Sequence, residues 1–303
     1  MSNAIEIKGL TKRYGQLTAL DGVGFSVAEG EMFGLIGPDG AGKTTLYRIL
    51  TTLLMPDSGT ATVGGLDVVK DYRQIRNMVG YMPERFSLYP DLTVSENLEF
   101  FASLFGVSVK KNYDLIAPIF GQLAKFPHRR AGALSGGMKQ KLALSCALIH
   151  RPKILLLDEP TTGVDAVSRS EFWDMLGTLK EKGISIMVST SYMDEAQRCE
   201  RIALIDKGRI LNVDTPARLV EGLDENLWNA SASDMYPLLE TVRSLPGVEN
   251  CYTFGATLHL VTSSDFNAED AMVSLKAKGI ADAKIYPAKG DIEDLFIKLA
   301  ANE

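Results

Sequence analysis

The sequence predicts an α/β domain built on a mostly parallel sheet, followed by a smaller α+β domain. Three runs rich in apolar residues, at 32–36, 153–158 and 184–188, have the composition of strands that are buried on both faces. They alternate with segments of helical character, and this alternation implies a parallel sheet that helices cover on both faces. The composition then shifts, and a second pattern of strands and helices begins. The expected domains are residues 1–218 and 219–303.

The start of the chain predicts a pair of antiparallel strands. Apolar residues alternate around Ile5 and again around Val27, and a Tyr-Gly turn lies between them at 14–15. The first buried strand is followed by a glycine-rich turn and then by a helix, which Pro56 ends. From about residue 86 to 150 the pattern is mostly helical, so we expect a helical subdomain there.

The second domain shows the order strand, helix, strand, strand, helix, strand. The helices are expected at 234–245 and 268–278, two strands lie around Phe254, and a strand lies near 284–286. A last helix is expected from Asp291. The order βαββαβ is the split-βαβ arrangement, so we expect a ferredoxin-like α+β domain. Its sequence shows no catalytic constellation, so we expect a role in dimerisation or regulation.

The composition is that of an ordinary folded protein of 303 residues. Apolar residues make up 46% and charged residues 23%, which excludes disordered and fibrous classes. The formal net charge of −6 offers no general attraction to nucleic acid, so we expect no nucleic-acid partner. No run approaches the roughly 18 apolar residues that span a bilayer, and the N-terminus lacks the apolar segment of a secretory signal. The 3 cysteines are scattered as reduced thiols are, so we expect a cytoplasmic protein.

A phosphate-binding motif follows the first buried strand. Residues 37–44, GPDGAGKT, fit the pattern G-x-x-x-x-G-K-[ST] between a strand and a helix. In such a loop the backbone N–H groups turn inward around phosphate oxygens, and the helix presents its positive end to the same anion. We expect Lys43 to reach the terminal phosphates of a nucleotide and Thr44 to bind Mg²⁺.

An acidic pair ends the second buried strand. Asp158 is its last residue, and Glu159 follows. A carboxylate in the first position can hold Mg²⁺ through water, and the next carboxylate can polarise an attacking water. Such a pair alone is a weak signal, because many strands end in acidic residues that meet solvent. It becomes much stronger in a chain that already carries a phosphate-binding loop.

A third motif, Ser135-Gly136-Gly137, opens a helix and so makes a second anion-binding helix N-terminus. Two such sites in one domain make sense if the nucleotide lies between two copies of it. With these motifs, residues 4–215 resemble the nucleotide-binding subunits of ABC transporters. The resemblance implies a P-loop NTPase of the ABC type, with a mixed sheet, an antiparallel β-subdomain and the helical subdomain.

The resemblance also implies which residues bind ATP and Mg²⁺. Tyr14 would stack on adenine, residues 135–137 would face the ATP of the partner, and Asp165 lies in the loop that links the two sites. The alternative for Tyr14 is an aromatic residue of the turn. The residues implied to contact ATP are Tyr14, Gly37, Pro38, Asp39, Gly40, Ala41, Gly42, Lys43, Thr44, Thr45, Ser135, Gly136, Gly137 and Asp165. Those implied to hold the metal are Thr44, Glu84 and Asp158.

Glu159 is implied to be the catalytic base, but two neighbouring positions depart from the family pattern. Glu84 stands where the family commonly has a Gln that contacts Mg²⁺ and the attacking water. A carboxylate can still coordinate the metal, so we expect altered strength and retained function. Ser191 stands where the family has a His bonded to the terminal phosphate. Ser can donate one hydrogen bond but cannot become cationic.

The loss of that His predicts slow hydrolysis. Removal of a positioned donor of this kind can cost on the order of a hundredfold in rate. Either Glu159 carries hydrolysis in a weakened site, or the chain is the slow member of an asymmetric pair. We favour the asymmetric pair. Two smaller departures, Asp39 for a common Asn and Met138 for a common Gln, are expected to be tolerated.

The function expected from the resemblance is ATP hydrolysis that drives export through a separate transmembrane permease. The C-terminal domain resembles that of drug-resistance exporter subunits, and the chain resembles the N-terminal half of tandem bacterial exporters. The second nucleotide-binding domain is then an identical copy, a different one, or one fused in the same protein. The permease would hold the chain at the inner face of the cell membrane.

The permease is expected to dock on the helical region after Glu84. We expect exposed contacts at Phe86, Leu88, Tyr89 and Leu92, and the alternative is that these residues belong to the core. Two other functions stay open. One is a soluble ABC ATPase that acts on DNA or ribosomes, and the other is a binding module that ATP gates without turnover, which Ser191 keeps open.

Overall fold

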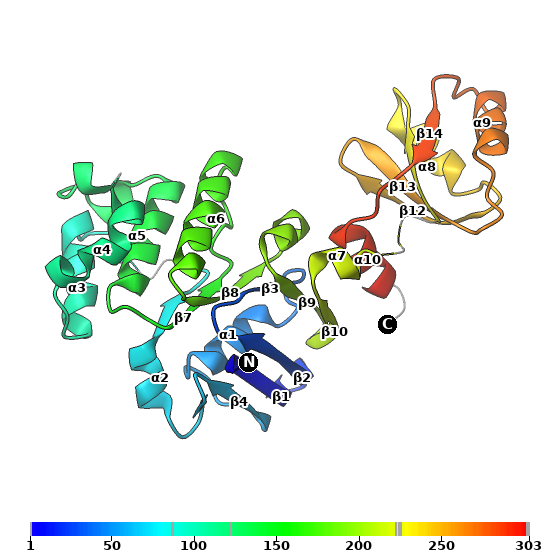
Figure 1. Cartoon of the computed structure of the whole chain (residues 1–303). Coiled ribbons are helices and arrows are strands. Elements are labelled where there is room, and N and C mark those ends of the chain that lie inside the picture. Colours follow the sequence, from blue (N-terminus) through cyan, green and yellow to red (C-terminus); the bar gives the residue numbers. More distant parts are fainter. Residues whose placement is uncertain (1, 86–87, 122, 222, 224–225, 301–303) are drawn as a thin grey trace. The chain divides into compact units, whose positions relative to one another are not determined.

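The computed structural model describes residues 2–85, 88–121, 123–221, 223 and 226–300. It divides into two compact units, Met1–Pro216 and Ala217–Glu303, whose elements are shown in Figure 1. Within the described ranges, no helix combines the length and the apolar content that crossing a bilayer requires.

The first unit contains an antiparallel sheet of 4 strands in the order β2-β1-β4-β5. Its strands are β1 Asn3–Tyr14, β2 Leu17–Ala28, β4 Ser58–Val63 and β5 Leu66–Asp67. The alternating apolar residues of β1 and β2 are paired: Ile7 lies opposite Phe25, and Ile5 lies opposite Val27. The predicted pair of antiparallel strands around the 14–15 turn is confirmed.

The second sheet of this unit has 6 strands in the order β10-β9-β3-β8-β7-β6. Its strands are β3 Met32–Ile36, β6 Val79–Met82, β7 Ile154–Asp158, β8 Ser185–Thr190, β9 Arg201–Asp206 and β10 Arg209–Asp214. All pairs are parallel except β9 with β10. Every residue of β3, β7 and β8 is buried, as the three apolar runs predict.

The register of this sheet brings distant motifs to one edge. Ile36, the last residue of β3, lies opposite Thr190 of β8, and Asp158 of β7 lies opposite Ser189. The phosphate loop, the acidic pair and the 190–192 segment therefore leave the sheet together at its carboxyl end. Ligands of open parallel sheets bind at this end.

Helices of the first unit cover the parallel sheet and form a separate helical group. They are α1 Lys43–Leu50, α2 Tyr72–Met78, α3 Val94–Leu104, α4 Val109–Phe120, α5 Gly136–Leu148 and α6 Ala166–Glu181, and α7 Pro216–Leu219 follows β10. A capping box between Thr93 and Glu96 fixes the start of α3. The helices α3, α4 and α5 pack on one another, in the part of the chain where a helical subdomain is predicted (Figure 1).

One apolar cluster joins the two sheets of the first unit. Leu46, Tyr47 and Ile49 of α1 are fully buried between residues of the antiparallel sheet, such as Ile5, and residues of the parallel sheet, such as Leu156. This packing fixes α1 and the loop that precedes it. Burial of such side chains stabilises the fold by about 1.5–3 kcal/mol each.

The second unit has its own core and its own sheet. Its elements are β11 Leu227–Ser231, α8 Met235–Val242, β12 Val248–Phe254, β13 Thr257–Thr262, α9 Ala268–Ala277, β14 Lys284–Pro287 and α10 Ile292–Ala300. The 4 strands are antiparallel in the order β12-β13-β11-β14. The elements before α10 follow one another as βαββαβ, the order that the sequence predicts. The helix predicted at 234–245 ends at Val242 as α8, because a turn closed by the Leu245 N–H and the Val242 carbonyl follows.

Candidate functional site

A cavity of about 760 Å³ lies at the carboxyl end of the parallel strands. Segments that are far apart in the sequence meet on its wall. Ten predicted site residues line it: Tyr14, Asp39, Gly40, Gly42, Lys43, Thr44, Thr45, Glu84, Glu159 and Ser191. Tyr14 and Ser191, the first and last predicted site residues in the sequence, therefore line the same cavity.

The phosphate loop is held in place by two close backbone approaches that only glycine permits. A Cβ on Gly37 would lie 2.1 Å from the Ile205 carbonyl oxygen. A Cβ on Gly42 would lie 2.3 Å from the Ala19 carbonyl oxygen, and Gly42 has a left-handed φ of +105°. The loop is therefore clamped between β2 and β9. Because Lys43 begins α1 and 43–45 line the cavity, the positive end of this helix faces the space.

Lys43 is buried and is bound by oxygens of the protein itself. Its Nζ donates to the Gly37 carbonyl at 2.6 Å and to the Pro38 carbonyl at 2.9 Å. The same Nζ lies 2.9 Å from Oε1 of Glu159. An anion that enters the cavity meets this ammonium and competes with Glu159 for it.

Glu159 stands at a strained turn at the end of β7. Its φ of +50° lies in the left-handed region, which costs a non-glycine residue about 1–2 kcal/mol. Its Oε2 accepts a hydrogen bond from Thr162 Oγ1 at 2.9 Å. The N–H and Oγ of Ser191 each lie 3.4 Å from the same oxygen. The carboxylate therefore lies between the phosphate loop and the 190–192 segment.

Asp158 is fully buried directly behind the cavity. Its Oδ1 accepts from Ser189 Oγ at 2.8 Å, and its Oδ2 has no hydrogen-bond partner in the part of the chain that the structure describes. Burial raises the pKa of Asp158, and the nearby carboxylates of Glu159 and Glu84 raise it further. A bound cation would relieve both effects.

Three side chains here carry oxygens that can bind a metal: the hydroxyl of Thr44 and the carboxylates of Asp158 and Glu84. Hard oxygen ligands of this kind suit Mg²⁺. Among the described residues no group of 3 or more His, Cys, Asp or Glu side chains could hold a metal by itself. In nucleotide sites Mg²⁺ usually keeps waters and binds substrate phosphates in addition to one or two carboxylates. The residues present fit the metal.

Ser135, Gly136, Gly137 and Asp165 do not line the cavity of their own chain. Ser135 caps α5 by accepting from the Met138 N–H, and Asp165 caps α6 by accepting from the Ser168 N–H at 3.0 Å. The two helix starts are packed together, because a Cβ on Gly137 would lie 2.7 Å from Ser168 Oγ. Ser135, Gly136 and Asp165 are exposed, so a second molecule can reach them, whereas Gly137 is buried.

Comparison with known proteins identifies the family. Residues 20–162 match the ABC transporter family. The Nod factor export ATP-binding protein I of Rhizobium sp. (strain N33) is 35% identical over 304 residues, which cover 99% of this chain and 98% of that protein. This chain belongs to the ABC transporter ATP-binding proteins.

Two other similar proteins add detail. The probable multidrug ABC transporter ATP-binding protein YbhF of Escherichia coli (strain K12) is 39% identical over 301 residues, and the match covers 97% of this chain but 52% of YbhF. The chain therefore spans about half the length of that relative. A solved dimeric ATP-binding cassette in a post-hydrolysis state, bound to ADP and Pi, has a TM-score of 0.63 and 26% identity. It matches 70% of this chain and 98% of its own. The predicted ABC-type ATPase fold is confirmed.

Several residues that line the cavity of about 760 Å³ lie outside the sequence motifs and were not predicted. They are Leu17, Thr18, Ala19, Thr162, Tyr192 and Lys207. Lys207 lies in the turn between β9 and β10 with a φ of +43°, and the next residue, Gly208, donates its N–H to the Ala41 carbonyl at 3.0 Å. The Lys-Gly pair, which is typical of a tight turn, is the sequence feature that could have indicated Lys207. The others come from strand ends whose position depends on the sheet order.

Proposed function

We propose that this chain binds ATP with Mg²⁺ and hydrolyses it at a head-to-tail interface of two ABC units, and so drives export through a separate membrane permease. The observation that carries the proposal is the single cavity of about 760 Å³ that the phosphate loop, Glu84, Glu159 and Ser191 share. The exposed residues Ser135, Gly136 and Asp165 are available to a second unit. The dimeric cassette with ADP and Pi supports a site made by two copies.

We propose the following roles for the site residues. Lys43, the loop N–H groups and the start of α1 hold the phosphates, and Tyr14, exposed at the cavity wall, stacks on adenine. Thr44, Asp158 and Glu84 would hold Mg²⁺, which would supply positive charge to the phosphate oxygens when bound. Glu159 takes the proton of the attacking water, because its carboxylate lies at the cavity wall between the phosphate loop and Ser191.

Ser191 makes the site slow. It lies 3.4 Å from the carboxylate of Glu159 and can orient that group, but it supplies no positive charge to the terminal phosphate. We propose that the chain is the slow member of an asymmetric pair, whose partner domain is a different or fused copy. Ser191 also keeps open the competing function, a module that ATP gates without turnover.

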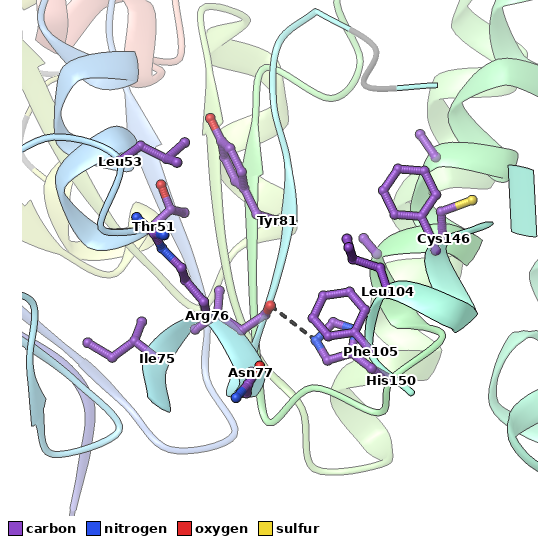
Figure 2. Close-up of a pocket in the computed structure, with 14 residues that line it drawn as sticks. Thr51, Leu53, Ile75, Arg76, Asn77, Tyr81, Leu104, Phe105, Cys146 and His150 are labelled. Carbon is purple, nitrogen blue, oxygen red and sulfur yellow. Dashed lines mark hydrogen bonds between the residues drawn. The ribbon is translucent and has the colours of Figure 1, made fainter. Parts of the chain in front are cut away.

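A second cavity, of about 560 Å³, supports the docking of a permease (Figure 2). Ile75 and Leu53 line it from the side of α1 and α2, and Leu104, Phe105 and His150 line it from the helical group. Leu53 and Leu104 are exposed by 61% and 65%, and exposed apolar residues beside a cavity are typical of an interaction site. A short apolar segment of the permease fits this surface.

Of the predicted docking contacts, Leu88, Tyr89 and Leu92 are among the described residues, and none of these three lines this cavity. Tyr89 is exposed and packs edge-on against Phe100, with ring centroids 4.7 Å apart. Leu88 and Leu92 are half-buried, and Phe86 lies outside the described residues. We therefore propose Tyr89 as a contact at the margin of the docking surface, and the cavity as its centre.

Export is the direction of transport that one relative's name supports, since it is named for Nod factor export; the other is named for multidrug transport with no direction. These names differ in cargo, so we assign none. The permease would place the chain at the cytoplasmic face of the membrane. The boundary after residue 218 and the ferredoxin-like assignment of the C-terminal domain, for dimerisation or regulation, stay predictions.

ATP hydrolysis by the purified chain tests the proposal. Lys43→Ala should abolish ATP binding and turnover, because it removes the ammonium in the phosphate loop. Lys182→Ala, at an exposed lysine outside the cavity, is the matched control. Wild-type protein that binds no ATP, or a Lys43→Ala variant that binds it normally, would contradict the proposal.

A further inference from the structure

A buried carboxylate with no role in the mechanism above lies behind the cavity. Glu195 is 5% exposed. Its Oε2 accepts a hydrogen bond from Thr161 Oγ1 at 3.0 Å and another from Thr190 Oγ1 at 2.6 Å. Its Oε1 is buried without a partner among the described residues. Burial of a carboxylate is costly unless its oxygens are hydrogen-bonded, and here two threonine hydroxyls supply those bonds to Oε2.

The two threonines belong to different segments of the active site. Thr161 follows Glu159 by two residues, and Thr190 directly precedes Ser191. Thr190 Oγ1 also accepts the N–H of Tyr192 at 3.0 Å, so that it holds both sides of Ser191. One carboxylate therefore ties the segment that carries Glu159 to the segment that carries Ser191.

The Glu159 segment is held from its other side as well. Gln140 of α5 is 1% exposed, and its Nε2 donates a hydrogen bond to the Pro160 carbonyl. Residues 160–161 are thus fixed between α5, which begins at the 135–137 motif, and Glu195. The strained φ of Glu159 needs such support, because backbone in the left-handed region persists only where the surroundings enforce it.

We propose that Glu195 is a positioning residue for hydrolysis: it fixes the carboxylate of Glu159 relative to Ser191. The proposal rests on the proposed ATPase function. Glu195, Thr161 and Thr190 do not line the cavity, so their loss should leave nucleotide contacts in place. A small misplacement of a catalytic group costs rate and spares binding.

Kinetics of three variants test this. Glu195→Ala, and separately Thr161→Val with Thr190→Val, should lower kcat by about ten- to a hundredfold while the KM for ATP changes by no more than about twofold. Glu195→Gln keeps an oxygen acceptor and should retain most of the rate. The matched control is Ser185→Ala, at the opposite end of β8, where a buried hydroxyl accepts the Gly30 N–H. Equal loss in the control and in Glu195→Ala, or an unchanged kcat in Glu195→Ala, overturns the proposal.

Amide hydrogen exchange gives a readout that does not depend on turnover. In Glu195→Ala, peptides covering 159–162 and 190–192 should exchange faster together, while peptides of β3 should not change. Unchanged exchange in both segments overturns the proposal, whatever the rate. Wild-type protein that fails to hydrolyse ATP would contradict the proposed function, whereas the exchange result would still decide the role of Glu195.

Discussion

The ammonium of Lys43 lies 2.9 Å from Oε1 of Glu159, and both side chains are buried. This ion pair joins the phosphate loop to the end of β7, across residues that are far apart in the sequence. An incoming phosphate and Glu159 compete for one ammonium. The charge of Glu159 therefore opposes nucleotide binding before it serves hydrolysis.

Glu159→Gln should separate these two effects. The amide cannot take a proton from water, so turnover should fall by about a hundredfold or more. The loss of the ion pair frees Lys43, so ATP should bind more tightly and hold a dimer, which light scattering at saturating ATP can detect. Glu171→Gln breaks an ion pair with Lys141 away from the cavity and is the control. Turnover at the wild-type rate in Glu159→Gln would rule out its role as base.

Gly42→Ala should disrupt the phosphate loop. The added Cβ would lie 2.3 Å from the Ala19 carbonyl oxygen at a φ of +105°, so the free energy of unfolding should fall by about 1–3 kcal/mol and ATP binding should be lost. The control is Gly177→Ala on α6, where nothing lies within 4 Å of the added Cβ. That variant should be as stable as wild type or more stable by up to about 1 kcal/mol. Urea unfolding and ATP titration measure both.

Much of the site could be predicted from the sequence because its chemistry is local. The glycines of the loop, the helix start at Lys43 and the acidic pair after β7 act through backbone geometry that a short pattern encodes. The Lys43–Glu159 ion pair could not be predicted, since it depends on the order of β3, β8 and β7 in the sheet. The same order brings Thr161 and Thr190 to Glu195, and no motif marks that residue.

Asp158→Asn should stabilise the protein when Mg²⁺ is absent. Because burial raises the pKa of Asp158, the folded state holds this proton more tightly than the unfolded chain does. Stability is then lost as pH rises from the unfolded value of about 3.9 through the raised folded pKa, so the ionised carboxylate costs stability above that window. The isosteric Asn carries no charge and therefore avoids the cost of burying an ionised carboxylate.

The expected gain in the free energy of unfolding at neutral pH is on the order of 1 kcal/mol, measured by urea unfolding in EDTA. The difference should vanish near pH 3, where the wild-type carboxyl is protonated in both states. Added Mg²⁺ and ATP should stabilise wild type far more than the variant. A variant that is less stable than wild type in EDTA at neutral pH would contradict this account of Asp158.

Lys207→Met should weaken nucleotide binding without loss of stability. The Lys207 ammonium is exposed at the cavity wall, and its ion pair with Asp206 is long, at 3.8 Å. An exposed ammonium near a phosphate contributes up to about 1 kcal/mol, so ATP and ADP affinity should each fall by about fivefold at low salt. Calorimetric titration measures this, with Lys182→Met as control. Equal affinities in the two variants would remove Lys207 from the site.

Ser191→His tests why the site is slow. Ser191 lies 3.4 Å from Glu159 Oε2 and lines the cavity, so a His side chain placed there can reach both the carboxylate and a bound phosphate. If the chain is a latent hydrolase, turnover should rise by tenfold or more, since one positioned donor can be worth on the order of a hundredfold. Tyr192→His, one residue further on the same wall, controls for the mere addition of an imidazole. Retained ATP binding with no gain in rate would favour an ATP-gated module over a slow ATPase. A gain in Ser191→His that Glu159→Gln abolishes would assign hydrolysis to this cavity.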